Sequence, residues 1–98
     1  MIVYEVNLHI DAIVADEYSE WLGPHIEHIL QIKGFRHADW YVCDSSDDKV
    51  HWSIRYHLDK RSSLANYLDN HAPMLIQEGI DKFGDHLTSN RRIMVLKN

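Results

Sequence analysis

Apolar and polar residues alternate along two segments of the chain, residues 2–10 and residues 50–58. Side chains of a strand point alternately to opposite faces, so this period of two predicts two half-covered β-strands. Residues 35–43 are rich in aromatic and β-branched side chains and are followed by the polar run Asp44–Asp48. This pattern predicts a third strand, joined to 50–58 by a hairpin loop and antiparallel to it. Residues 92–96 predict a short closing strand.

Two longer segments carry apolar residues at spacings of three and four, which is typical of amphipathic helices. In residues 15–32 this stripe runs from Tyr18 to Ile32, and Gly34 predicts the end of the helix. In residues 62–84 we expect Ser62 or Ser63 to cap the start. The apolar set changes face after Pro73 and continues as Ile76, Ile80, Phe83 and Leu87. A kink or break is expected there, because proline lacks the backbone donor of a continuous helix.

The resulting order β-α-β-β-α-β predicts a ferredoxin-like α+β fold, with one antiparallel four-stranded sheet. Right-handed crossovers would place both helices on the same face of that sheet. The even positions of 2–10 and 50–58 would face the helices. Without a repeat or a linker, we expect residues 1–98 to form a single domain. The open face is expected to carry Glu5, Asn7, His9, His51, Ser53, Arg55 and His57.

Composition narrows the partners and the compartment. The chain has 98 residues and a net charge of -5, so we expect no nucleic-acid partner, because a basic surface for phosphates is missing. No apolar run reaches the ~20 residues that cross a bilayer, and no signal-peptide pattern opens the sequence, so we expect no membrane association. With one cysteine, Cys43, an internal disulfide is excluded, and we expect a cytoplasmic protein. A core this small and an open sheet face predict a homodimer.

Several short motifs occur in one order along almost the full length of the chain. They are Met1–Asp11, Trp21-Leu22, His25-Ile26, Gly34-Phe35, Ala72-Pro73 and Phe83-Gly84. In these motifs the chain resembles a family of small bacterial proteins that is known as a domain of unknown function. That family is placed with the dimeric α+β barrels, whose members include antibiotic-biosynthesis monooxygenases. The resemblance implies a dimer and a pocket between the helices and the sheet. The chain departs from the family pattern at Pro24, which precedes the histidine of the first helix, whereas many members have a proline after His-Ile.

Two histidines lie within the apolar stripes of the predicted helices. His25 lies among Tyr18, Leu22, Ile29 and Ile32, and His71 lies beside Leu64, Leu68 and Leu75. If both stripes face the sheet, His25 and His71 are candidate catalytic residues that share one cavity. The aromatic side chains of Tyr4, Trp52, Tyr56 and Tyr67 are candidate ligand-binding residues of that cavity. The alternative is that each histidine is a structural residue bonded to a backbone carbonyl.

No metal and no cofactor is implied by the spacing of candidate ligands. His25 and His28 are three residues apart on one helix, but the spacing indicates no third ligand. We expect Cys43 to be a packed apolar residue and Asp44–Asp48 to be a solvated loop. His51 and His57 are expected at the surface or at a dimer rim. Three functions remain open: a homodimeric module for a small apolar or aromatic ligand, a cofactor-independent monooxygenase- or isomerase-like enzyme, and a protein-interaction domain without a pocket.

Overall fold

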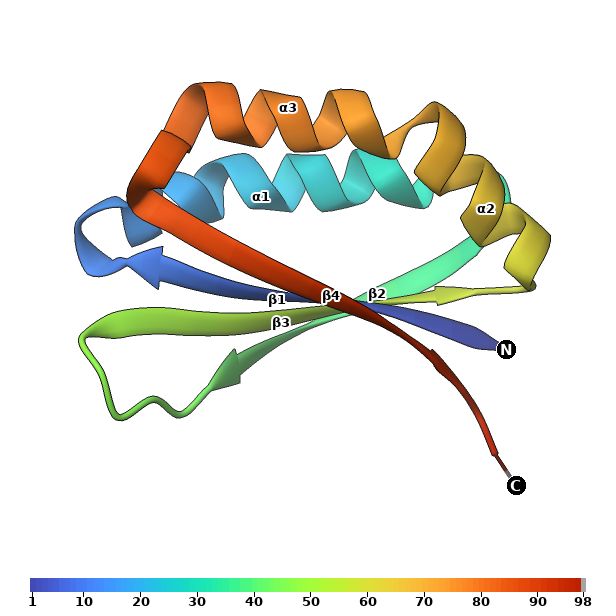
Figure 1. Cartoon of the computed structure of the whole chain (residues 1–98), viewed down its shortest axis with the longest axis horizontal. Helices are drawn as coiled ribbons and strands as arrows, with labels where there is room; N and C mark the ends of the chain where they lie inside the picture. Colours follow the sequence, from blue (N-terminus) through green and yellow to red (C-terminus); the bar gives the residue numbers. More distant parts are fainter. Residues whose placement is uncertain (98) are drawn as a thin grey trace.

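The computed structural model describes residues 1–97 and joins four strands into one antiparallel sheet in the order β2-β3-β1-β4. The strands are β1 (Ile2–Asp11), β2 (Phe35–Cys43), β3 (Lys49–Leu58) and β4 (Leu87–Val95). The helices are α1 (Ala15–Leu30), α2 (Arg61–Asn70) and α3 (Ala72–Phe83), with 3-10 turns at Ala12–Val14 and Gly84–His86. All three helices lie on the same side of the sheet (Figure 1). The ferredoxin-like α+β fold predicted from the sequence is therefore confirmed.

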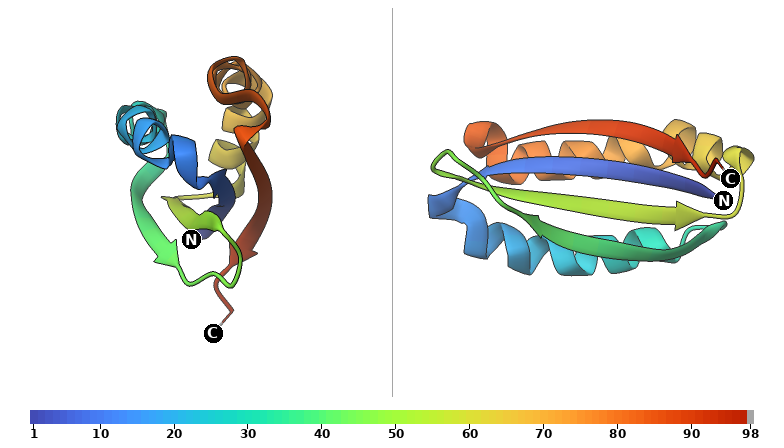
Figure 2. Two further views of the ribbon diagram at one scale, coloured as in Figure 1. Left: turned by 90° about the vertical axis from the view of Figure 1, so that its left-hand side faces the viewer. Right: turned by 90° about the horizontal axis from the view of Figure 1, so that it is seen from below.

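The helical layer is divided between α1 and α3, which run side by side above the sheet (Figure 2). α1 lies on the side of β2, and α3 lies on the side of β4. Seen from below, the opposite sheet face carries no helix in the part of the chain that the structure describes (Figure 2). None of the described helices is long and apolar enough to cross a membrane.

The core lies between this sheet and the helices, on the face that the alternation predicts. Most even positions of β1 and β3 are buried there, and Ile10 and Leu58 are wholly inaccessible to solvent. α1 contributes Tyr18, Leu22 and Ile29, which are also buried. Burying large apolar side chains is the main favourable contribution to folding, so this face holds the sheet and helices together.

The open face is not uniformly exposed to solvent, because it contains a nearly inaccessible carboxylate. Glu5 is 1% exposed, and its oxygens accept hydrogen bonds from Arg55 Nε at 3.0 Å, Arg92 Nε at 2.6 Å and Asn7 Nδ2 at 2.9 Å. These donors come from β3, β4 and β1, so one side chain links the three strands. A carboxylate buried in this way requires such charged and polar partners.

Three boundaries differ from the sequence prediction. The helix expected over 62–84 is broken at His71 into α2 and α3, as the change of face at Pro73 suggested, with Pro73 in the first turn of α3. The serine cap was wrong: Lys60 precedes α2 without a side-chain cap, and Ser63 Oγ instead donates to Asp59 Oδ1 at 2.6 Å. The last strand begins at Leu87 rather than at residue 92, because α3 ends at Gly84, which has a φ of 55°.

A bulge at the start of β2 reverses the side-chain alternation of that strand. Phe35 pairs with Leu58, but His37 pairs with His57, so Arg36 is an extra residue in the ladder. An extra residue moves every later side chain to the other face. Phe35 is accordingly buried under the helices, whereas His37 lies on the open face together with its partner His57.

The cysteine is not packed as the sequence suggested. Cys43 is exposed at the end of β2, where the strand runs into the exposed hairpin loop of residues 44–48. That prediction was wrong because Cys43 pairs with His51 on the open face of the sheet, away from the helix-covered core.

Candidate functional site

A cavity of about 270 Å³ lies between the sheet and the helices α1 and α3. Its floor is made by β1, β3 and β4, and its walls by the facing sides of the two helices. This volume lies just below the range of about 300 to 1,000 Å³ that is common for small-molecule sites. The aromatic and polar residues that line it are Tyr4, Tyr18, Trp21, His25, Tyr56, Tyr67, Ser89 and Arg91.

Aromatic rings form a continuous wall of the cavity. The rings of Tyr18 and Trp21 stack with centroids 5.6 Å apart, and Trp21 stacks in turn on His25 at 4.4 Å. The ring centroid of Tyr4 on the floor lies 6.2 Å from that of Tyr56, also on the floor, and 5.9 Å from that of Tyr67 on α2. Such rings combine a large apolar surface with polar edges, so the cavity suits a flat aromatic ligand.

Arg91 is the one cationic side chain among the lining residues of this cavity. Burial raises the pKa of Tyr4, and Arg91 opposes that rise through its charge and through a side-chain hydrogen bond. Burial also raises the pKa of Tyr18 and of Tyr67 to about 12, again against the charge of Arg91. The phenols are therefore neutral at physiological pH and remain hydrogen-bond donors. Within residues 1–97 no carboxylate forms an ion pair with Arg91, whose guanidinium donates to Ser89 Oγ at 3.1 Å.

His25 contributes an ionisable ring from α1. It is half-buried, and burial lowers its pKa, while the charge of Glu78 on α3 raises it and that of His28 lowers it. The net effect favours the neutral imidazole, which has one nitrogen able to accept a proton. A neutral imidazole beside an aromatic cavity can act as a hydrogen-bond partner or as a general base.

The structure brings together four of the six side chains that the sequence singled out. His25, Tyr4, Tyr56 and Tyr67 line the cavity, and their roles in binding or catalysis stay predictions. His71 and Trp52 are not among the lining residues, so the two histidines do not share this cavity. The ring of His71 stacks 6.5 Å from that of Tyr67, near the break between α2 and α3.

Trp52 lies outside the cavity lining because its side chain packs between other aromatic rings. Its ring lies 6.2 Å from Tyr18 and 4.9 Å from Trp40. It thus supports the wall formed by Tyr18 from the side of β3.

Arg91 is the main lining residue that the sequence analysis missed. The closing strand was expected to begin only at residue 92, so the face of residue 91 was not considered. A signal was present, since Leu87, Ile93 and Val95 are apolar positions of one parity, and Arg91 has the same parity as these three. Arg91 is itself exposed, so it reaches the cavity from the edge strand β4.

Comparison with known proteins assigns the chain to a family. The model of the family described as "Domain of unknown function (DUF4286)" matches residues 1–97. The chain belongs to this family. Among proteins with curated descriptions, none matches this DUF4286 chain.

Solved structures show the same fold at low sequence identity. The cofactor-independent oxygenase SnoaB from Streptomyces nogalater has a TM-score of 0.71 and 11% identity, over 99% of this chain and 94% of that chain. An antibiotic biosynthesis monooxygenase has a TM-score of 0.72 and 15% identity over 100% of both chains. An ethyl tert-butyl ether d (ethd) family protein from Bacillus halodurans has a TM-score of 0.68 and 16% identity, over 99% of this chain and 100% of that chain. The DUF4286 chain therefore shares the fold of monooxygenase-like proteins.

Proposed function

We propose that this protein is a homodimeric module that binds a small aromatic ligand carrying an anionic oxygen in the cavity between the sheet and α1 and α3. The observation that carries this proposal is Arg91, a guanidinium without a carboxylate partner in residues 1–97, beside neutral tyrosine hydroxyls and aromatic walls. A guanidinium binds a carboxylate through two parallel hydrogen bonds. The aromatic walls supply the apolar area that such a ligand buries.

A pair of matched probes tests the anionic group. We expect 1-naphthoate to bind and to quench tryptophan fluorescence through Trp21, which lines the cavity. The neutral analogue 1-naphthalenemethanol should bind about 10- to 150-fold more weakly, since hydrogen bonds to charged groups contribute about 1.5 to 3 kcal/mol. Equal affinities for the two probes, or no binding of either, would contradict the proposal.

Two neighbouring arginines provide the variant and its control. Arg91→Met keeps an apolar side chain at the cavity and removes the charge, so it should abolish the preference for 1-naphthoate. Arg92→Met alters the next residue, whose guanidinium lies on the open face and donates to Glu5. That control should leave the affinity for 1-naphthoate within about twofold of the wild type, and an equal loss in both variants would refute the role of Arg91.

The homodimer is proposed to form through the open face of the sheet. Val3 lies on this face between His57 of β3 and Met94 of β4, so the apolar side chains of Val3 and Met94 are neighbours there. Light scattering should give twice the chain mass of 11.6 kDa at micromolar concentration. Val3→Lys should shift the protein toward the monomer, whereas Ile13→Lys, at a residue 86% exposed before α1, should not. A wild-type mass of one chain would remove the dimer from the proposal.

We also propose that residues 1–98 form one domain and that the protein is cytoplasmic, as expected from the sequence. Fractionation of cells that express the tagged chain tests the location, and recovery in the membrane or exported fraction would overturn it.

A second candidate function is an enzyme in which His25 acts as the base. It is favoured by the position of His25 in the cavity and by the lowered pKa of its imidazole. His25 would take the phenolic proton of the ligand. The phenolate would then be reprotonated at an activated ring carbon, which isomerises it to the keto tautomer, or would add dioxygen at that carbon as the oxidant and take the proton back as a hydroperoxide. We expect the protein to accelerate exchange of the activated ring hydrogens of 1,3-dihydroxynaphthalene with deuterium, measured by NMR. His25→Gln should reduce the rate to that of buffer, whereas unchanged exchange would exclude the base.

A further inference from the structure

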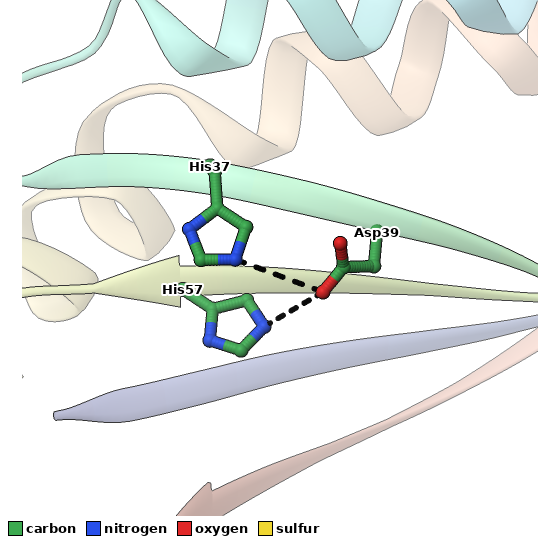
Figure 3. A group of neighbouring side chains, drawn as sticks. All are labelled: His37, Asp39 and His57. Carbon is green, nitrogen blue, oxygen red and sulfur yellow. Dashed lines mark hydrogen bonds and ion pairs between the residues drawn. The ribbon is translucent and has the colours of Figure 1, made fainter.

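Three side chains with metal-binding atoms meet on the open face, on the opposite side of the sheet from the cavity. Asp39 Oδ2 lies 3.2 Å from His57 Nε2 and 3.7 Å from His37 Nε2 (Figure 3). All three atoms lie within 4.8 Å of one another, and in the part of the chain that the structure describes this is the one such group. Figure 3 shows both imidazoles directed toward the same carboxylate oxygen.

The bulge in β2 creates this arrangement. Because Arg36 is the extra residue, His37 pairs directly with His57 across the ladder, and Asp39 follows two positions later on the same face. Without the bulge, His37 and Asp39 would lie on the helix side, away from His57. Bulges redirect side chains in this way, and they are frequent beside functional sites.

The spacing of the three atoms is close to that of ligands around one metal ion. Zn²⁺ binds imidazole nitrogen and carboxylate oxygen at about 2.0 to 2.2 Å, so neighbouring ligand atoms of a tetrahedral site are about 3.3 Å apart. The two nitrogen–oxygen distances of 3.2 and 3.7 Å bracket that value. The stacked rings of His37 and His57, with centroids 4.1 Å apart, need only a rotation that brings their Nε2 atoms together. The ring of His37 can make this rotation, because its side chain is 55% exposed.

The histidine from β3 presents the correct nitrogen. His57 is 20% exposed, and its Nδ1 is buried without a hydrogen-bond partner among residues 1–97. In the single chain, Nε2 is therefore the nitrogen that an ion can reach. Asp39 is 43% exposed and supplies the negative charge of the group.

We propose that His37, Asp39 and His57 form a binding site for one divalent first-row transition-metal ion, with two imidazole nitrogens and one carboxylate oxygen. This donor set suits Zn²⁺, Co²⁺ and Fe²⁺ better than Ca²⁺ or Mg²⁺, which prefer oxygen ligands. Three protein ligands leave at least one coordination position for water or for a further ligand. The sequence predicted no metal site, because His25 and His28 on helix 15–32 have no third ligand at a suitable spacing.

A second histidine pair on the same face serves as a matched control. The rings of His9 and His51 stack at 4.4 Å, and His51 Nε2 lies 2.9 Å from Asp47 Oδ1. This pair therefore has similar residues and similar contacts, but its atoms do not converge as a group of three.

The test uses the untagged full-length chain after treatment with a chelator. Co²⁺ titration followed by visible absorption, and Zn²⁺ titration followed by calorimetry, should each show one saturable site per chain. His37→Gln and Asp39→Asn should weaken binding at least about tenfold, since even the outer partners of metal ligands contribute 10- to 100-fold. His51→Gln should stay within about twofold of the wild type, and circular dichroism should show that all variants are folded.

Three results would overturn the site: no saturable binding by the wild type, a stoichiometry other than one ion per chain, or equal losses in His37→Gln and His51→Gln. The test is independent of the cavity. 1-Naphthoate should bind equally well to His37→Gln and to the wild type, so failure of one proposal leaves the other standing.

Discussion

Replacing Gly34 by alanine should be among the most damaging single-methyl changes in this protein. Gly34 joins α1 to β2 and has a φ of 96°, which side-chain-bearing residues rarely adopt. A Cβ at this position would lie 2.2 Å from Ser63 Oγ and 2.9 Å from Asp59 Oδ1. The backbone cannot easily move away, because the carbonyl of Gly34 accepts a hydrogen bond from the Asp59 amide at 3.0 Å.

Two costs therefore add at Gly34. A non-glycine residue held in an unfavourable backbone conformation costs about 1 to 3 kcal/mol. Overpacking against the buried Ser63 costs about 1 to 3 kcal/mol more. The total of about 2 to 6 kcal/mol corresponds to a fall in Tm of at least about 8 °C for a domain of this size.

Chemical denaturation at one fixed protein concentration measures this loss, and two other glycines calibrate it. At Gly84, with a φ of 55°, an added Cβ meets nothing within 4 Å, so Gly84→Ala should incur the backbone cost alone. At Gly23, inside α1 and also with open space, alanine should stabilise by about 0.5 to 1 kcal/mol. If Gly34→Ala were no less stable than Gly84→Ala, the argument from the contact with Ser63 would fail.

Three further predictions concern titrating groups. Burial lowers the pKa of His25, so its imidazole binds a proton more readily in the unfolded chain than in the folded one. Stability should therefore fall as the pH drops from 7 through 6.5 to 5, and thermal melts of His25→Gln should show a flatter slope across this range. Burial opposes ionisation of Glu5, but hydrogen bonds from Arg92 and Asn7 and the charges of Arg92 and Arg55 lower the pKa of its carboxyl group. The stability that this carboxylate contributes should therefore disappear below about pH 4.5, and an unchanged acid profile in Glu5→Gln would contradict this. Burial raises the pKa of Tyr18 to about 12, so stability should fall above pH 10, where the phenol of the unfolded chain ionises. In a titration followed by absorbance at 295 nm, Tyr18→Phe should remove a component near pH 12 rather than one near pH 10.

Much of the candidate cavity was open to sequence reasoning, since periodicity assigns side chains to faces. The even positions of residues 2–10 and 50–58 placed Tyr4 and Tyr56 under the helices, and the helical stripes placed His25 and Tyr67 above them. The error at His71 has a local cause. A residue at the break between α2 and α3 has the backbone angles of neither helix, with a φ of -123°, so a 3.6-residue period does not fix its direction.

The sequence by itself determined the fold class and the two faces of β1 and β3, because alternation and helical spacing are local properties that survive in any tertiary context. Only the tertiary structure decided where two other strands place their side chains. β4 begins at Leu87, where it pairs with Ile10, and this pairing directs Arg91 into the cavity. The bulge at Arg36 arises because Phe35 must be buried while His37 pairs with His57. Register between distant strands depends on contacts across the whole sheet, so no local pattern within residues 35–43 could reveal that His37 and Asp39 meet His57.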